Sequence, residues 1–247
     1  MPSLVVTRQR RIAVLTLNRA EQGNRLTTAL ANEVAAALHD ARDDAGVGAC
    51  VLTGAGDVFC LGGDYRGAGP TDEGRHAYAD SLLALDDAMA RLRKPLVAAV
   101  NGNAHAGGFG LMAACDLAVA ADDATFGLPE AAAGLFPFIA LATVRDALPK
   151  KVLFDLIYRS RLMKAVETIS LHLINEALPR EHVLARAITL AEQASSHNPE
   201  IVALGRSLYY ETRGARAPEA FQQARRALLD ALAAMDRTTT SPRGDIP

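Results

Sequence analysis

The stretch "NGNAHAGGFGLMAACDLAVA", residues 101–120, decides how the chain folds. Three glycines, at positions 107, 108 and 110, stand at the head of an apolar run that contains one acid, Asp116. Glycine lets a backbone turn sharply and approach a neighbour or a ligand closely. We therefore predict that a strand over residues 95–102 runs into a glycine turn and that a buried helix follows it.

Strands and helices alternate on both sides of this stretch. Alternating or continuous apolar runs predict strands at residues 11–18 and 48–56, and two short strands within 116–130. Helical periodicity predicts helices at residues 27–42 and 77–93, with residues 57–74 as a loop between them. From about residue 140 onward the apolar pattern is helical. The order predicts an α/β core followed by a helical C-terminal part.

A second glycine-rich element, "FCLGGD" at residues 59–64, also follows a buried strand. Free N–H groups gather where a strand runs into a helix, beside the partial positive charge of the helix N-terminus. Two such elements side by side could direct two N–H donors at one oxygen, which is the arrangement of an oxyanion hole. The glycines do not have the GxGxxG spacing of a dinucleotide site, and no GK[ST] follows them as in a P-loop.

Composition excludes several classes of function. The formal net charge is −2, aromatic residues make up 5% of the chain and Trp is absent, which argues against a nucleic-acid partner. No apolar run is long enough and free enough of polar residues to span a membrane. The three cysteines, Cys50, Cys60 and Cys115, lack metal-site spacing, so we expect small core residues and no metal. We expect a cytoplasmic protein.

Three ordered motifs resemble the enoyl-CoA hydratase/isomerase (crotonase) family: "VLTGAGDVFCLGGD", "KPLVAAVNGNAHAGGFGLMAACDLAVA" and "ATFGLPEAAAGLFP". The resemblance implies an α/β fold in which ββα units form a spiral, with a helical C-terminal region used in trimerisation. We place the spiral core at residues 1–190 and the helical region at 191–247. The resemblance also implies an acyl-CoA thioester as ligand, with coenzyme A as part of the substrate rather than a separate cofactor. The expected assembly is a homotrimer or a dimer of trimers.

The same resemblance assigns roles to particular positions. It implies that the backbone amides of Gly63 and Gly107 hold the thioester carbonyl oxygen, and that Glu130 is a catalytic carboxyl group. A hydratase of this family resembles "GGGCEL" at the second motif, and its first catalytic Glu falls here on Gly110. Hydratases use a pair of carboxyl groups to activate water and deliver a proton, so the chain keeps one of two.

Other positions are expected to line the substrate site. Arg25 lies in the loop where the family holds part of CoA, and it is either a phosphate or adenine contact or a solvated surface arginine. The remaining candidates are Gly62, Asp64, Tyr65, Gly108 and Phe138. We expect Gly108 to allow close packing at the helix head, Asp64 to fix its loop, and Phe138 to form an apolar wall beside Glu130. Three further expectations concern residues without a ligand role: His105 packs beside the glycine turn, Asp116 caps a turn, and Tyr209 and Tyr210 belong to the core. The alternative for His105 is a base near the oxyanion hole.

The single carboxyl group favours double-bond isomerisation of an enoyl-CoA, because an isomerase needs only one acid/base group. Hydration of enoyl-CoA is the alternative, because the motifs as a whole resemble those of hydratases. A 3-hydroxyacyl-CoA hydrolase is disfavoured, because the Asp that such a hydrolase of this family carries after the Pro is Phe138 here. A homologue that binds acyl-CoA without turnover stays open, because Gly110 replaces a carboxylate.

Overall fold

The computed structural model describes the backbone of residues 2–239 and the side chains of residues 2–233. Its larger sheet has six strands, in the order β1-β2-β3-β5-β7-β10. They are β1 (Leu4–Gln9), β2 (Ile12–Leu17), β3 (Ala49–Gly54), β5 (Leu96–Val100), β7 (Leu117–Ala121) and β10 (Glu176–Leu178). Only β1 runs antiparallel to its neighbour. Every residue of β3 and β5 is buried, as expected of parallel strands covered on both faces.

A second, smaller sheet contains the strands β4, β6, β8 and β9 in that order. They are β4 (Val58–Cys60), β6 (Asn103–His105), β8 (Thr125–Gly127) and β9 (Met163–Lys164). Consecutive strand pairs β3–β4, β5–β6 and β7–β8 each give one strand to each sheet, and each pair is followed by a helix. This repetition is the spiral of ββα units that the sequence predicted. Phe59, Phe109 and Phe126 fill the interior and are fully buried, each contributing about 1.5–3 kcal/mol.

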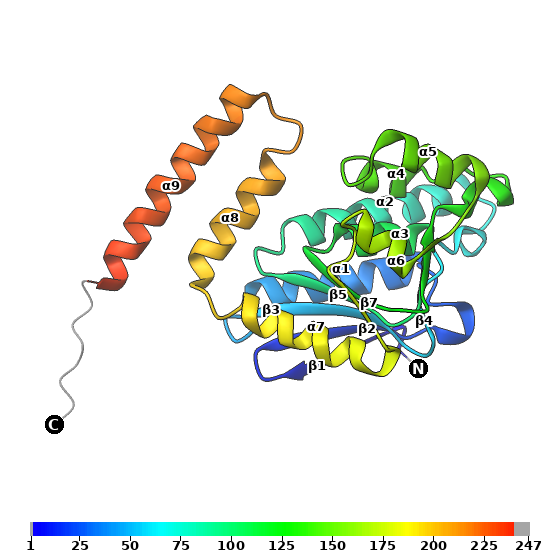
Figure 1. Cartoon of the computed structure of the whole chain (residues 1–247), viewed down its shortest axis with the longest axis horizontal. Coiled ribbons are helices and arrows are strands. Elements are labelled where there is room, and N and C mark those ends of the chain that lie inside the picture. The colour runs from blue at the N-terminus through cyan, green and yellow to red at the C-terminus, as the bar shows by residue number, and fades with distance from the viewer. Residues whose placement is uncertain (1, 240–247) are drawn as a thin grey trace.

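Nine helices and three 3₁₀ turns accompany the sheets in residues 2–239. The helices are α1 (Thr28–Asp43), α2 (Asp72–Ala90), α3 (Gly107–Ala114), α4 (Phe138–Val144), α5 (Lys150–Arg159), α6 (Ala165–Ser170), α7 (Arg180–Ala194), α8 (Pro199–Glu211) and α9 (Ala217–Thr239). The 3₁₀ turns are η1 (Ala20–Gln22), η2 (Tyr65–Ala68) and η3 (Pro129–Ala133). Figure 1 shows the helices of the central part packed around the strands. Among residues 2–239, no helix combines the length and the apolar character needed to cross a bilayer.

The segment 57–74, predicted as a loop, is partly regular structure. It contains β4, η2 and the first turn of α2. Thr71 caps α2, because its hydroxyl accepts a hydrogen bond from the Gly74 amide at 3.1 Å, and Asp72 and Glu73 follow in the first turn. Because of its glycines, this segment was predicted as a loop, so the three-residue strand β4 was missed. The start of α2 was missed as well, and it lies five residues before the predicted start. The short strands β6, β9 and β10 were not predicted either.

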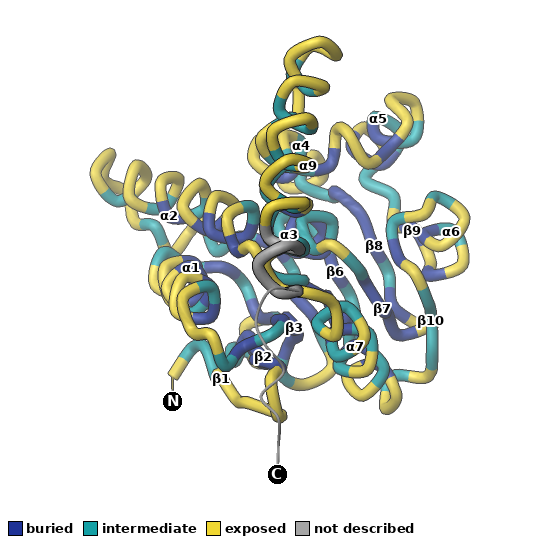
Figure 2. The backbone as a smooth tube through the Cα atoms, turned by 90° about the vertical axis from the view of Figure 1, so that its left-hand side faces the viewer, coloured by how far each residue is buried: buried dark blue, intermediate teal, exposed yellow. Residues whose placement is uncertain are grey.

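The C-terminal helices α8 and α9 form an antiparallel pair beside the sheets (Figure 1). Arg206 fixes α8 to the core: its buried guanidinium donates to the carbonyls of Met89 and Ala90 and pairs with Asp116 at 2.9 Å. Up to residue 233, no residue of α9 is buried (Figure 2). Within residues 217–233 of α9, the exposed large apolar side chains are Phe221, Leu228, Leu229 and Leu232. The predicted boundary at residue 190 falls inside α7, and the division into two regions stays a prediction.

Candidate active site

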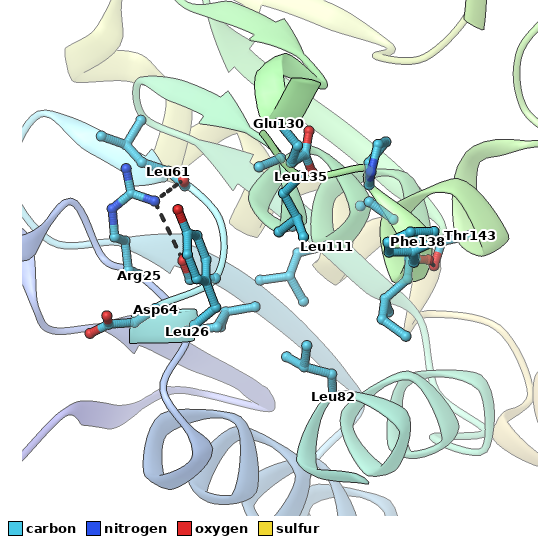
Figure 3. Close-up of a pocket in the computed structure, with 18 of the residues that line it drawn as sticks. Arg25, Leu26, Leu61, Asp64, Leu82, Leu111, Glu130, Leu135, Phe138 and Thr143 are labelled. Atoms are coloured by element: carbon cyan, nitrogen blue, oxygen red, sulfur yellow. Dashed lines mark hydrogen bonds between the residues drawn. The ribbon is translucent and has the colours of Figure 1, made fainter. Parts of the chain in front are cut away.

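A cavity of about 540 Å³ opens beside the two glycine turns. Its wall is formed by the loop around Arg25, the first glycine turn, one face of α2, the start of α3, and the segment from Pro129 to Thr143. Figure 3 shows Glu130 and Leu135 above Leu111, with Arg25 and Asp64 on one side and Phe138 and Thr143 on the other. The volume suits a small-molecule ligand.

The first glycine turn is locked to the loop that precedes α1. The Leu26 amide donates to the Gly62 carbonyl at 2.9 Å, and the Asp64 amide donates to the Leu26 carbonyl at 2.8 Å. Arg25 donates to the Leu61 carbonyl at 2.7 Å and, at 3.5 Å, to the Gly63 carbonyl (Figure 3). Gly62 has a φ of +100°, which favours glycine. The Gly63 amide makes no hydrogen bond within the described residues.

The second glycine turn begins α3. Ala106 precedes the helix with φ 54° and ψ −127°, a conformation that costs a residue with a side chain about 1–3 kcal/mol. Its own amide is held by the Gly127 carbonyl at 2.8 Å. The helix therefore starts at Gly107, whose amide has no partner in the described chain. A Cβ on Gly107 would lie only 3.6 Å from the Gly63 nitrogen, so the two turns adjoin.

Seven of the nine predicted site residues line the cavity: Arg25, Gly63, Asp64, Tyr65, Gly107, Glu130 and Phe138. Gly62 and Gly108 do not line it, which corrects their expected place. Gly62 sits behind the turn, where a Cβ would lie 2.5 Å from the Ala106 Cβ. Gly108 packs on β4, where a Cβ would collide with the Cys60 carbonyl. Both glycines bring the two turns together, and Gly108 provides the close packing that the sequence predicted.

Glu130 lies in the first turn of η3, directly after Pro129. Its Oε2 atom is buried, and no group in the described chain donates to it. Burial raises the pKa of Glu130 to about 7, opposed in part by a hydrogen bond from its own backbone amide. A carboxyl group with this pKa can both accept and return a proton near neutral pH.

Two other acids line the cavity, and both have partners. Asp64 forms an ion pair with Arg19 at 3.4 Å. Asp86 lies at the far end, where its carboxylate accepts a hydrogen bond from Thr143 at 3.4 Å. Gly110 lines the cavity on α3, and a Cβ there would lie 3.4 Å from Ala140 of α4. The position where a hydratase-like motif carries its first Glu therefore supplies no acid.

The residues expected to have no ligand role follow the expectation in part. His105 forms a hydrogen bond with the Thr125 hydroxyl at 2.8 Å and does not line the cavity, and burial, followed by the charge of Arg25, lowers its pKa. Asp116 does not cap a turn as expected: its carboxylate accepts from the Leu96 amide at 2.8 Å and from Arg206, so it fixes the start of β5. Tyr209 was placed in the core wrongly, because its exposed fraction is 66%.

One face of α2 lines the cavity and was not predicted as part of the site. Its residues Tyr78, Leu82, Leu85 and Met89 are spaced i, i+4, i+7 and i+11. This spacing places them on one side of a helix. The signal was present in the sequence, since a helix was predicted over 77–93, but periodicity does not say whether an apolar face meets a core or a ligand.

Comparison with known proteins agrees with this geometry. The family model described as "Enoyl-CoA hydratase/isomerase" matches residues 7–242. A putative enoyl-CoA hydratase of Thermus thermophilus is 34% identical over 219 residues, which cover 86% of each chain. The 2,3-dehydroadipyl-CoA hydratase of Escherichia coli is 32% identical over 208 residues, covering 81% of this chain and 78% of that protein.

Solved structures of similar proteins have the same fold as this chain. An enoyl-CoA hydratase of Mycobacterium smegmatis superposes with a TM-score of 0.88 at 26% identity, covering 98% of this chain and 93% of that one. The fold has two sheets built from ββα units, and its two glycine turns adjoin. Together with the family match over residues 7–242, these features show that the chain belongs to the enoyl-CoA hydratase/isomerase, or crotonase, family.

Proposed function

We propose that this enzyme moves a double bond in an enoyl-CoA thioester, with Glu130 as its one acid/base group. The observation that carries the proposal is the combination of a half-buried Glu130 carboxyl, whose Oε2 atom has no partner in the described chain, with the absence of an acid at Gly110. Coenzyme A enters as part of the substrate, and we propose no separate cofactor.

The amides of Gly63 and Gly107 would hold the thioester oxygen. Both residues line the cavity, their turns adjoin, and neither amide is used by the described chain. Donors held in place before the reaction stabilise negative charge as it develops, without reorganisation. Arg25 and Leu26 support the first amide by fixing the backbone around it.

The reaction would proceed by one proton shuttle. The Glu130 carboxylate removes a proton from C2 of a 3-enoyl-CoA, and the electron pair passes into a dienolate whose charge rests on the thioester oxygen. The same carboxyl group then returns the proton to C4, which leaves the double bond between C2 and C3. A group with a pKa near 7 suits both steps.

An assay of products tests this proposal. Incubation with 3-enoyl-CoA should give 2-enoyl-CoA, and Glu130→Gln should abolish the conversion while keeping the fold. Asp86→Asn is the matched control, because it neutralises another cavity carboxyl that is hydrogen-bonded to Thr143. Conversion that survives Glu130→Gln would overturn the assignment.

Hydration is the second candidate, and it rests on the names of the relatives, which are called hydratases. It needs a second group to activate or orient water. Formation of 3-hydroxyacyl-CoA from 2-enoyl-CoA as the faster reaction would favour hydration over isomerisation. Gly110→Glu should then raise hydration, with Gly110→Ala as control for the added Cβ, which would meet Ala140 at 3.4 Å.

Two further outcomes of the same assay are informative. Release of free CoA from a 3-hydroxyacyl-CoA would indicate hydrolysis. Tight CoA binding without any product would indicate a homologue that binds acyl-CoA without turnover. The homotrimer or dimer of trimers and the cytoplasmic location stay predictions, and sedimentation analysis would test the first of them.

A further inference from the structure

Tyr78 of α2 lines the cavity next to the first glycine turn. A Cβ built on Gly63 would collide with the Tyr78 hydroxyl oxygen, and it would lie 3.3 Å from the ring carbon Cζ. The hydroxyl therefore occupies the space that a side chain at position 63 would need. It lies against the residue whose amide we propose to hold the thioester oxygen.

The Tyr78 hydroxyl has no hydrogen-bond partner among the side chains and backbone of residues 2–233. A half-buried phenol normally donates to a neighbour or to water, because leaving a buried donor unused is costly. Here the carbonyls around the turn are already engaged: Leu26 donates to Gly62, and Arg25 donates to Leu61 and to Gly63. Tyr78 lines the cavity, so its unused hydroxyl is left for a ligand or water there.

The phenol keeps its proton across the working pH range. Burial raises the pKa of Tyr78 to about 12, and the charge of Asp64 adds to this, with Arg25 acting in the opposite direction. A protonated phenol is a donor whose strength grows with the negative charge on its acceptor. It is not a nucleophile or a base at neutral pH.

We propose that Tyr78 is a catalytic residue that donates a third hydrogen bond to the thioester oxygen, beside the amides of Gly63 and Gly107. The assignment rests on the proposed oxyanion hole and extends it. No bond is made or broken at Tyr78: its O–H stays intact, and the hydrogen bond shortens as the oxygen gains charge in the enolate. The contact with the Tyr78 hydroxyl then accounts for the glycine at position 63.

Tyr78→Phe tests the assignment, because it removes the hydroxyl and keeps the ring. We expect kcat to fall by about 10²-fold, as for loss of one donor to an oxyanion, with a much smaller change in KM. Tyr158→Phe on α5 is the matched control: this side chain is 70% exposed and lies outside the cavity wall, so its kcat should not change.

A spectroscopic readout separates this role from a structural one. A conjugated 2,4-dienoyl-CoA bound to the wild-type protein should absorb at longer wavelength than in water, because donors to the carbonyl oxygen polarise the chromophore. Tyr78→Phe should reduce this red shift at saturating probe, and Tyr158→Phe should preserve it. The measurement does not require turnover.

A double-mutant cycle with Gly63→Ala supplies an independent test. In the wild-type background the new methyl group collides with the Tyr78 hydroxyl, so the red shift and kcat should both drop. In the Tyr78→Phe background the nearest ring atom would lie 3.3 Å from the new methyl group. Gly63→Ala should then reduce the red shift and kcat much less. Equal costs in the two backgrounds would show that the residues are not coupled.

The outcomes distinguish failure of the proposed role of Tyr78 from failure of the proposed oxyanion hole. A wild-type protein that binds the probe without a red shift overturns the oxyanion hole and the role of Tyr78 together. A wild-type red shift that Tyr78→Phe leaves intact, with kcat unchanged, overturns the role of Tyr78 alone. Reduced red shift and reduced kcat in Tyr78→Phe, with both kept in Tyr158→Phe, support it.

Discussion

The wall of the cavity that carries the glycine turns and the wall that carries Glu130 are built in opposite ways. The glycine turns are held by backbone hydrogen bonds, by Arg25 and by close packing of α3 on β4. Glu130 stands on a short 3₁₀ turn that is followed by exposed residues, among them Leu135 and Phe138. Donors to an oxyanion must be fixed in place, whereas an acid/base group needs a suitable pKa, which nearby apolar side chains can provide.

The largest effect on stability should come from disrupting the wall that carries the glycine turns, at the contact between α3 and β4. Gly108→Ala forces a Cβ against the Cys60 carbonyl, a backbone atom that cannot turn away. We expect a loss of about 3 kcal/mol in the free energy of unfolding, at the upper end of overpacking costs, measured by urea denaturation. Gly205→Ala on α8 is the control, since a Cβ there meets nothing within 4 Å, and it should stabilise by about 0.5–1 kcal/mol. An unchanged midpoint for Gly108→Ala would contradict the packing.

On the other wall, opening the surroundings of Glu130 should change the pH profile rather than the fold. Leu135 lies next to Glu130 in Figure 3 and is 41% exposed, so Leu135→Ser admits water at little cost in stability. The pKa of Glu130 should then fall from about 7 and move the acid limb of kcat/KM by roughly one pH unit. Val166→Ser, at an exposed position on α6, should not move the limb. A profile unchanged by Leu135→Ser would show that other groups set this pKa.

The same pKa predicts a pH dependence of stability. The folded protein keeps the Glu130 proton up to about pH 7, whereas the unfolded chain releases it near pH 4.5. Stability should therefore fall as pH rises through this window. Glu130→Gln should remove this part of the slope and make the variant more stable above pH 7. Because solvent screens the partly exposed carboxyl, we expect a difference of about 1 kcal/mol, measured by thermal unfolding at pH 4 and pH 8. Parallel curves would contradict it.

The smallest effect should come from relaxing the backbone of the second turn. Ala106→Gly removes the cost of a positive φ and should raise stability by about 0.5–1 kcal/mol. The same substitution in the last turn of α3, Ala113→Gly, should lower stability by about the same amount. Opposite signs for one chemical change would show that position 106 is strained. Chemical denaturation of both variants measures this.

The resemblance of three ordered motifs to a known family implied the spiral, and apolar or alternating runs predicted most of its long strands. Periodicity did not predict β4 or β6, since a strand of three residues is too short to show any. The start of α2 was missed for a related reason: Gly74 sits in its first turn, although Thr71 offered a cap. Short elements of this kind are stabilised by their neighbours in the sheet and not by local preference.

Glu130, Gly63 and Gly107, to which the motifs assigned roles, all line the cavity, and their roles stay predictions. Gly62 and Gly108 belong to the same two motifs, but they pack against neighbouring backbone and side chains and do not line the cavity. Tyr78 was missed because its importance arises from a contact with a residue fifteen positions earlier in the chain. Such a contact between a helix and a turn leaves no trace in the spacing of either segment.

The absence of buried residues in the described part of α9 has a consequence for hydrogen exchange. Amides in β3 and β5 are covered on both faces and should exchange only when the whole core opens. Amides of α9 in a lone chain should exchange through local opening that costs little free energy, since α8 alone is tied down, through Arg206. If Phe221, Leu228 and Leu232 meet another copy of the chain, their protection becomes a function of protein concentration.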